Sequence, residues 1–276
     1  MRTLDLRTVE LEQSINLKYI ENSQNHNKKT MTTVVGIKSV DGIILASDSQ
    51  GTSSGDGMKD LEISKIFQIN ESIGVGAAGD VGQIRVLVDE LKKHFERSKF
   101  RTELDLRQTL DDILCELFRK YDVERSEKLG FHKTVFLFEP AAILGAKIQD
   151  GTFALYRLRF PPWVDPIDDY DAIGTGDLYA KLLVRQQSRV APVGLSEIGL
   201  NYNIWISMLT INEIKTFDSK TGGSTQVAII DKHGFRQMKR DEVVTLYNQY
   251  REMIASGLSE KLGIPKERAL ALYPDP

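Results

Sequence analysis

The fold is decided by residues 31–49, which read MTTVVGIKSVDGIILASDS. Residues 32–38 and 42–47 are rich in the β-branched side chains that strands favour. The intervening Val40-Asp41-Gly42 is typical of a hairpin turn. This stretch therefore predicts an antiparallel hairpin that opens the folded part of the chain.

The sequence before this hairpin has a different character. Residues 21–30 are almost wholly polar and cannot bury a core. We interpret residues 1–31 as a polar N-terminal leader, removed or disordered, or as a mis-assigned start. An alternative is a short amphipathic helix over residues 4–20. Residues 32–276 are expected to form a single domain with a C-terminal helical extension.

Hydrophobic periodicity predicts the remaining elements. Strands are expected at 63–69, 72–77, 134–138, 142–149, 152–158, 226–231 and 235–239, and helices at 84–95, 106–118, 176–187, 196–215 and 241–259. We expect Asp241 to cap the last helix, Cys115 to be a small core residue, and residues 160–166 to form a stiff loop. Runs of strands followed by runs of helices predict an α+β fold with helices layered on sheet.

Composition limits the classes of function. Apolar residues make up 41% of the 276 residues and charged residues 27%, which is typical of globular proteins. The net charge of -3 gives a nucleic-acid partner no support. Four histidines and one cysteine argue against a structural zinc site, and no apolar run approaches the roughly 20 residues that span a bilayer. We therefore expect no metal, no cofactor, no membrane contact and a cytoplasmic location.

Five motifs, in order along the chain, resemble those of proteasome β-type subunits. They are residues 31–49, Ser64-Lys65-Ile66-Phe67, the turn 76–82 (GAAGDVG), Ile173-Gly174-Thr175-Gly176, and residues 218–223 (DSKTGG). The last two carry threonine where the family has serine. The resemblance covers about residues 32–239, and it implies the N-terminal-nucleophile fold, a four-layer αββα sandwich of the α+β class.

The resemblance also implies a threonine peptidase whose nucleophile is Thr32, used as the first residue of the mature chain. A hydroxyl is a weak nucleophile until a base takes its proton. In this family the base is the threonine's own α-amine, whose pKa of roughly 7.7–8.0 lies near neutrality. Lys65 would lower that pKa as a neighbouring like charge, and Asp48 would hold Lys65 charged and oriented.

Further residues are implied by the resemblance alone. The supporting residues are Gly79, as backbone oxyanion donor, and Thr175, Asp218 and Thr221 around the amine and its water. The expected substrate-binding residues are Gly51, Thr52, Ile63, Ala77 and Val81. Thr52 would lie along the substrate backbone. Because Ala77 is small and uncharged, we expect the pocket for the residue before the cut to prefer neutral side chains.

Each of these residues also has an ordinary structural interpretation. Thr32 could be a plain strand residue, Asp48 a turn residue and Lys65 a solvated lysine. The glycines could serve backbone geometry alone, and Thr175 and Thr221 could cap helices. The joint pattern, not any single motif, favours an active site.

Met31 departs from the family, because most β-type precursors carry glycine before the nucleophile. Two routes to a free Thr32 stay open. Either the threonine cuts the Met31–Thr32 bond itself, or translation begins at Met31 and an aminopeptidase removes that residue. The second route matches the Met-Thr-Thr start of the bacterial proteasome relative HslV, and we favour it.

The expected assembly is a homo-oligomeric ring that degrades unfolded polypeptides, with an α-type ring or an ATPase unfoldase as candidate partners. Two other functions stay open. One is a non-catalytic structural ring subunit, such as an α-type subunit. The other is a single-chain amidase of the same superfamily that acts on a small amide.

Overall fold

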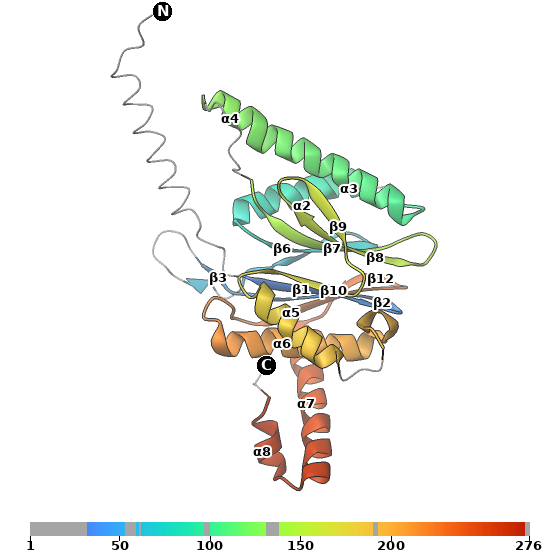
Figure 1. The fold of residues 1–276 in the computed structure, drawn as a ribbon, viewed down its shortest axis with the longest axis vertical. Coiled ribbons are helices and arrows are strands. Elements are labelled where there is room, and N and C mark those ends of the chain that lie inside the picture. Colours follow the sequence, from blue (N-terminus) through green and yellow to red (C-terminus); the bar gives the residue numbers. More distant parts are fainter. Residues whose placement is uncertain are drawn as a thin grey trace, which may run out of the picture.

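The computed structural model describes residues 32–52, 59–60, 62–96, 100–130, 138–189 and 193–273. These residues form four layers (Figure 1). Two antiparallel five-stranded sheets lie face to face, and helices cover the outer side of each sheet. The predicted αββα sandwich is therefore confirmed. The predicted leader, residues 1–31, lies outside the described residues.

The first sheet has the strand order β10-β1-β2-β11-β12. Its strands are β1 (Thr33–Ser39), β2 (Gly42–Asp48), β10 (Tyr170–Gly174), β11 (Thr225–Asp231) and β12 (Gly234–Gln237). The predicted opening hairpin forms here, with Val34 opposite Ser47 and Ser39 opposite Gly42. Because side chains alternate along a strand, Val34 packs between the sheets while Val35 packs toward the helices.

The second sheet has the order β5-β6-β7-β8-β9. Its strands are β5 (Ile66–Asn70), β6 (Ile73–Ala78), β7 (Ala141–Lys147), β8 (Phe153–Arg159) and β9 (Trp163–Pro166). The expected loop at 160–166 is thus partly wrong, since β9 pairs with β8; it is an edge strand, where proline is tolerated. The strand expected at 134–138 lies outside the described residues except for Phe138. A two-stranded ribbon joins β3 (Gly51–Thr52) to β4 (Lys59–Asp60).

The helices α2 (Val81–Phe95) and α3 (Glu103–Phe118) cover the second sheet (Figure 1). A π-helical segment, Arg119–Val123, leads from α3 into α4 (Glu124–Lys128). Cys115 is exposed, so its expected core position is wrong. Its neighbour Leu114 is buried, and one residue later the helix has turned by about 100° toward solvent.

The helices α5 (Asp177–Ser188) and α6 (Leu200–Phe217) cover the first sheet, with a short 3-10 turn at Leu195–Glu197 before α6. The closing helix α7 spans Arg240–Leu262, and Lys239 rather than Asp241 is its N-cap. Asp241 lies in the first turn, where its charge still suits the helix dipole. A last helix, α8 (Lys266–Leu270), was not predicted.

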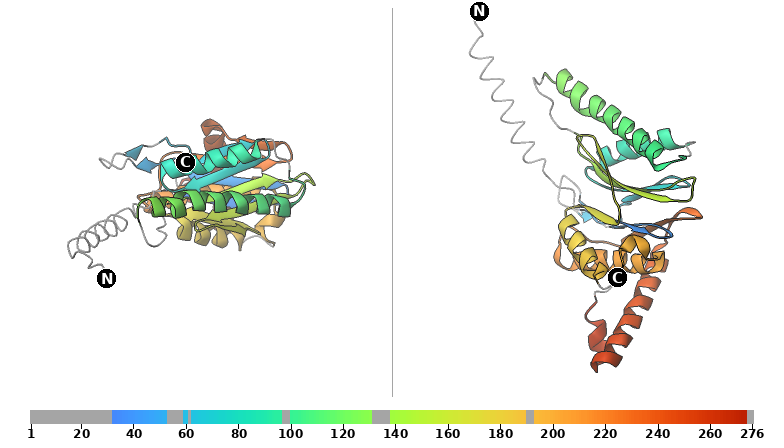
Figure 2. Two further views of the ribbon diagram at one scale, coloured as in Figure 1. Left: turned by 90° about the horizontal axis from the view of Figure 1, so that it is seen from above. Right: turned by 45° about the vertical axis from the view of Figure 1, so that its right-hand side comes forward.

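The α7–α8 pair projects away from the sandwich and returns to it (Figures 1 and 2). At its base, the Trp205 ring on α6 lies 5.2 Å from the ring of Tyr247 and 6.1 Å from that of Tyr273. These two helices follow the last strand, β12, and the division of residues 32–276 into one domain with a C-terminal extension stays a prediction. No helix among the described residues is both long and apolar enough to cross a membrane.

Candidate active site

Asp48 is the centre of the predicted site. It ends β2 and is fully buried. Its Oδ1 accepts hydrogen bonds from the Lys65 ammonium at 2.8 Å and from the Thr33 backbone N–H at 2.9 Å. Its Oδ2 accepts from the backbone N–H groups of Gly222 at 3.1 Å and Gln50 at 3.2 Å. One carboxylate therefore joins the start of β1, the entry to β5 and the turn before β11.

Lys65 is held by both sheets. Its backbone N–H donates to the Gln226 side chain of β11 at 3.0 Å, and its carbonyl accepts from Ala77 N–H of β6 at 2.9 Å. Its side chain is only 5% exposed. Burial lowers the pKa of Lys65, and the adjacent Asp48 carboxylate offsets part of this effect. The Lys65 ammonium and the Thr33 N–H thus share one acceptor, while the predicted effect of Lys65 on the Thr32 amine stays a prediction.

Thr32 immediately precedes β1 and is 5% exposed. Its carbonyl accepts a hydrogen bond from Thr175 N–H at 2.8 Å, and the Thr175 hydroxyl lies 3.5 Å from the same oxygen. Thr175 thus holds the backbone of the predicted nucleophile. Gly174 makes this approach possible, because a Cβ built on it would lie 1.9 Å from the Thr32 carbonyl oxygen.

Replacing Gly174 by alanine is expected to displace Thr32. The new methyl would collide with backbone, and Gly174 also has a φ of +98° that alanine disfavours. We expect roughly 2–4 kcal/mol lower stability and at least about tenfold slower peptide cleavage. Urea denaturation and a fluorogenic peptide assay measure the two effects.

The matched control is Gly151→Ala. Gly151 has a similar φ of +90°, but nothing lies within 4 Å of its added Cβ. This variant carries only the backbone strain, about 1–2 kcal/mol, and should cleave peptides normally. Equal effects of the two substitutions on cleavage would show that the collision with Thr32 is unimportant.

Asp218 and Thr221 form a chain of hydrogen bonds that ends on Thr33. The Thr221 hydroxyl donates to Asp218 Oδ2 at 2.8 Å. The Thr33 hydroxyl lies 2.8 Å from the Thr221 oxygen and must therefore donate to it. Their expected place around the Thr32 amine stays a prediction; the hydrogen bonds place Thr33, which the sequence did not single out, at the end of the chain.

Gly79, the expected oxyanion donor, directly follows β6 and has a φ of +143°. A Cβ there would lie 3.1 Å from the Pro140 Cα. Asp80 caps α2 by accepting from Gln83 N–H at 3.1 Å. The turn at Gly79 is thus two residues beyond Ala77, whose N–H binds the Lys65 carbonyl. Its role as oxyanion donor stays a prediction.

The expected substrate-binding residues lie on different elements of the structure. Gly51 and Thr52 form β3, and Ile63 N–H donates to the Ser49 carbonyl at 3.0 Å beside Asp48. Val81 begins α2 and is 44% exposed. Ala77 is fully buried in the core between the second sheet and its helices. The pocket and its preference for neutral side chains stay predictions.

Sequence reasoning missed the backbone donors of Gln50 and Gly222. The two residues pack tightly, since a Cβ on Gly222 would lie 2.1 Å from Gln50 Oε1. The Gly222 carbonyl also accepts from the N–H groups of Ser49 and Gln50. The glycine pair at 222–223 was the available signal, because close backbone approach often requires glycine.

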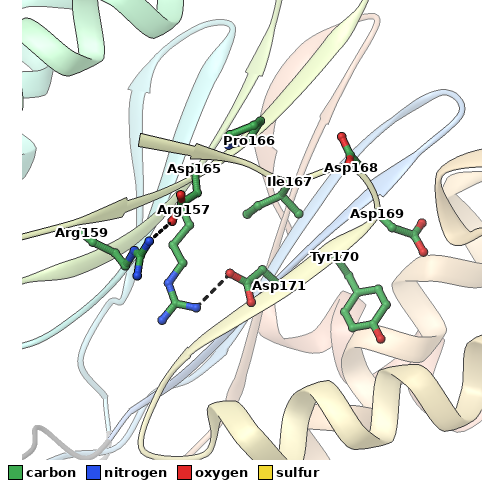
Figure 3. A pocket seen from close by; sticks show the side chains of 9 residues that line it. All are labelled: Arg157, Arg159, Asp165, Pro166, Ile167, Asp168, Asp169, Tyr170 and Asp171. Atoms are coloured by element: carbon green, nitrogen blue, oxygen red, sulfur yellow. Dashed lines mark hydrogen bonds and ion pairs between the residues drawn. The ribbon is translucent and has the colours of Figure 1, made fainter. Parts of the chain in front are cut away.

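A cavity of about 450 Å³ lies away from these residues (Figure 3). It opens where the chain passes from β9 to β10. Four of its charged side chains form two ion pairs: Arg157 binds Asp171 at 3.1 Å and Arg159 binds Asp165. None of the predicted site residues lines it. Among the described residues, no group of three His, Cys, Asp or Glu side chains could hold a metal ion.

The comparisons with known proteins agree with this architecture. Residues 28–189 match the family model described as proteasome subunit. The chain is 27% identical to "Proteasome subunit alpha" of Methanobrevibacter smithii, over 80% of this chain and 82% of that protein. It is also 27% identical to "Proteasome subunit beta 1" of Pyrococcus abyssi, over 80% of this chain and 100% of that protein. It shares 31% identity with "Proteasome subunit beta 2" of Thermococcus onnurineus, over 55% of this chain and 69% of that protein.

The family model covers more than half of the chain, and the fold agrees with it. The protein belongs to the proteasome subunit family. Its relatives include proteins named as alpha and as beta subunits, so the names alone leave the type of subunit open.

Proposed function

We propose that this chain is a threonine-type endopeptidase subunit of a proteasome-like ring, with Thr32 as nucleophile once it is the first residue. One observation carries the proposal. A single buried oxygen, Asp48 Oδ1, accepts from both the Lys65 ammonium and the Thr33 N–H. The shared acceptor holds the Lys65 ammonium in a fixed position relative to Thr33, the residue that follows the nucleophile.

The reaction uses two groups of Thr32. Its hydroxyl attacks the carbonyl carbon of the substrate while the hydroxyl proton passes to its own α-amine. The amine then returns a proton to the leaving nitrogen, which leaves an ester on Thr32. Water activated by the same amine hydrolyses the ester. Lys65 disfavours protonation of the amine as a like charge, and the Gly79 N–H stabilises the oxyanion.

A non-catalytic ring subunit is the second candidate, because one relative that matches 80% of the chain is named an alpha subunit. The buried Asp48–Lys65 pair speaks against it. Removing two charges from water is costly, and apolar side chains of similar size commonly stabilise a fold as well or better. A purely structural subunit has no need of such a pair.

A peptidyl vinyl sulfone tests the proposal, because this electrophile is attacked by an activated hydroxyl. We expect the adduct on Thr32 in the N-terminal peptide of the mature chain, read by mass spectrometry. Modification of a residue other than Thr32 would overturn the assignment of the nucleophile. So would the absence of any adduct in protein that cleaves peptides. A ring on native sizing columns distinguishes the subunit from a single-chain amidase.

A further inference from the structure

A second lysine, Lys215, lies near Asp48 and has no part in the mechanism so far. It occupies the last turn of α6. Its ammonium donates to the Thr225 hydroxyl at 2.6 Å and to the Asn212 side-chain oxygen at 3.0 Å. The Thr225 hydroxyl itself donates to Asn212 at 2.7 Å. Both acceptors of this half-buried cation are neutral, so neither compensates its positive charge. The charge therefore also acts on groups farther away.

The sheet register places this network beside Asp48. Thr225 begins β11 and lies directly opposite Asp48 of β2. Lys215 comes from α6, which covers the outer face of the first sheet, whereas Lys65 leads into β5 of the second sheet. Asp48 therefore has cations from two different layers of the sandwich.

The charged groups around Lys215 are few and identifiable. Asp48 of β2 attracts its charge, and Arg240 at the start of α7 repels it. Burial, the largest effect, lowers the pKa of Lys215 to about 8. Lys215 is thus mostly charged at pH 7 and mostly neutral above pH 9.

We propose that Lys215 is a positioning residue of the threonine site, which supplies a second positive charge beside Asp48 and favours the unprotonated form of the Thr32 amine. The inference rests on the proposed function. Thr33 and Thr225 flank β2 on neighbouring strands, so they lie roughly 10 Å apart, and an unscreened charge acts over that distance. Lys65, Asp48 and Asp218 are the other charges near the start of β1.

The sign of the effect follows from like-charge repulsion. Replacing Lys215 by methionine removes a positive charge and makes protonation of the Thr32 amine easier, so the pKa of the amine rises. The expected shift is about 0.5 to 1 unit, which slows cleavage at pH 7 about three- to tenfold. Above pH 9 wild type and variant should converge, because wild-type Lys215 is then neutral as well.

The test measures the Thr32 amine directly. Assembled mature protein that begins at Thr32 is acetylated with acetic anhydride across pH 6–10, and mass spectrometry of the N-terminal peptide gives the pKa of the amine without reference to catalysis. We expect a higher pKa in Lys215→Met and an unchanged one in Lys215→Arg, which keeps the charge. Lys181→Met, which removes from α5 a cation paired with Asp171 of β10, is the matched control and should shift nothing.

An unshifted amine in Lys215→Met overturns the inference, even if the variant is less stable. Should Lys215→Met fail to fold, the shape of the wild-type curve decides. Coupling to Lys215 makes the titration curve of the wild-type Thr32 amine broader than that of a single group. Lys215→Arg should narrow this curve. Identical titration curves for the wild type and Lys215→Arg overturn the inference. A mature chain without a reactive Thr32 amine instead refutes the proposed function, so the two failures are distinguishable.

Discussion

Replacing Thr32 by alanine is expected to reduce peptide cleavage by about 10³-fold or more. The variant keeps the α-amine but loses the hydroxyl that forms the ester. The backbone carbonyl of Thr32 still accepts from Thr175, so the fold should persist. Initial rates with a fluorogenic peptide measure the loss, and native sizing checks assembly.

Thr32→Ser is the matched control for this variant. Serine keeps both the hydroxyl and the amine, so a substantial fraction of the activity should remain. Thr33→Ala addresses the neighbouring threonine, whose hydroxyl binds Thr221 and not the substrate carbon in our account. If Thr32→Ala cleaved peptides at the wild-type rate, or if Thr33→Ala alone abolished cleavage, Thr32 would not be the nucleophile.

Replacing Asp48 by asparagine is expected to damage both stability and activity. Asp48 is fully buried and pairs with an almost fully buried Lys65. Removing one partner of a buried pair costs about 3–5 kcal/mol, because the other charge is left uncompensated. The asparagine amide would also point donors at the N–H groups of Gly222 and Gln50, or at Lys65.

The pKa of Lys65 should fall further in Asp48→Asn. Burial lowers this pKa, and Asp48 is what raises it in the wild type. A neutral Lys65 no longer disfavours protonation of the Thr32 amine, so cleavage at pH 7 should drop steeply. The urea midpoint and the pH profile of kcat/KM measure the two effects.

Asp165→Asn provides the comparison for Asp48→Asn. Asp165 forms an ion pair with Arg159 in which both side chains are partly exposed. Such pairs contribute about 1 kcal/mol or less, so the urea midpoint should move little. A loss of stability as large as that of Asp48→Asn would mean that burial of the Asp48–Lys65 pair is not the cause.

Much of the fold was predictable because the local signals agree with one another. The Val40-Asp41-Gly42 turn lies between two strands that pair as expected. The errors arose where tertiary contacts decide. Strand β9 ends in Pro166 and exists because β8 offers it a partner. Cys115 lies within an apolar pattern but one position away from the buried face of α3.

The candidate site was predictable only where side-chain identity carries the information. Asp48 and Lys65 were expected as a pair, and they are one. The glycine pair at 222–223 indicates a close approach of backbone, but it does not show which carboxylate the N–H groups of Gln50 and Gly222 bind, because the tertiary turn sets their direction. Lys215 was missed for a similar reason: the register of β11 against β2 brings it near Asp48.

The central claim is that an amine and a hydroxyl on one residue carry out the reaction. Its most direct test is the N-terminal residue of active protein purified from its own cell, read by N-terminal sequencing and intact mass. We predict a mature chain that begins at Thr32 with an unmodified amine. A chain that begins at Met1, or whose Thr32 amine is blocked, and that still cleaves peptides at full rate would contradict it.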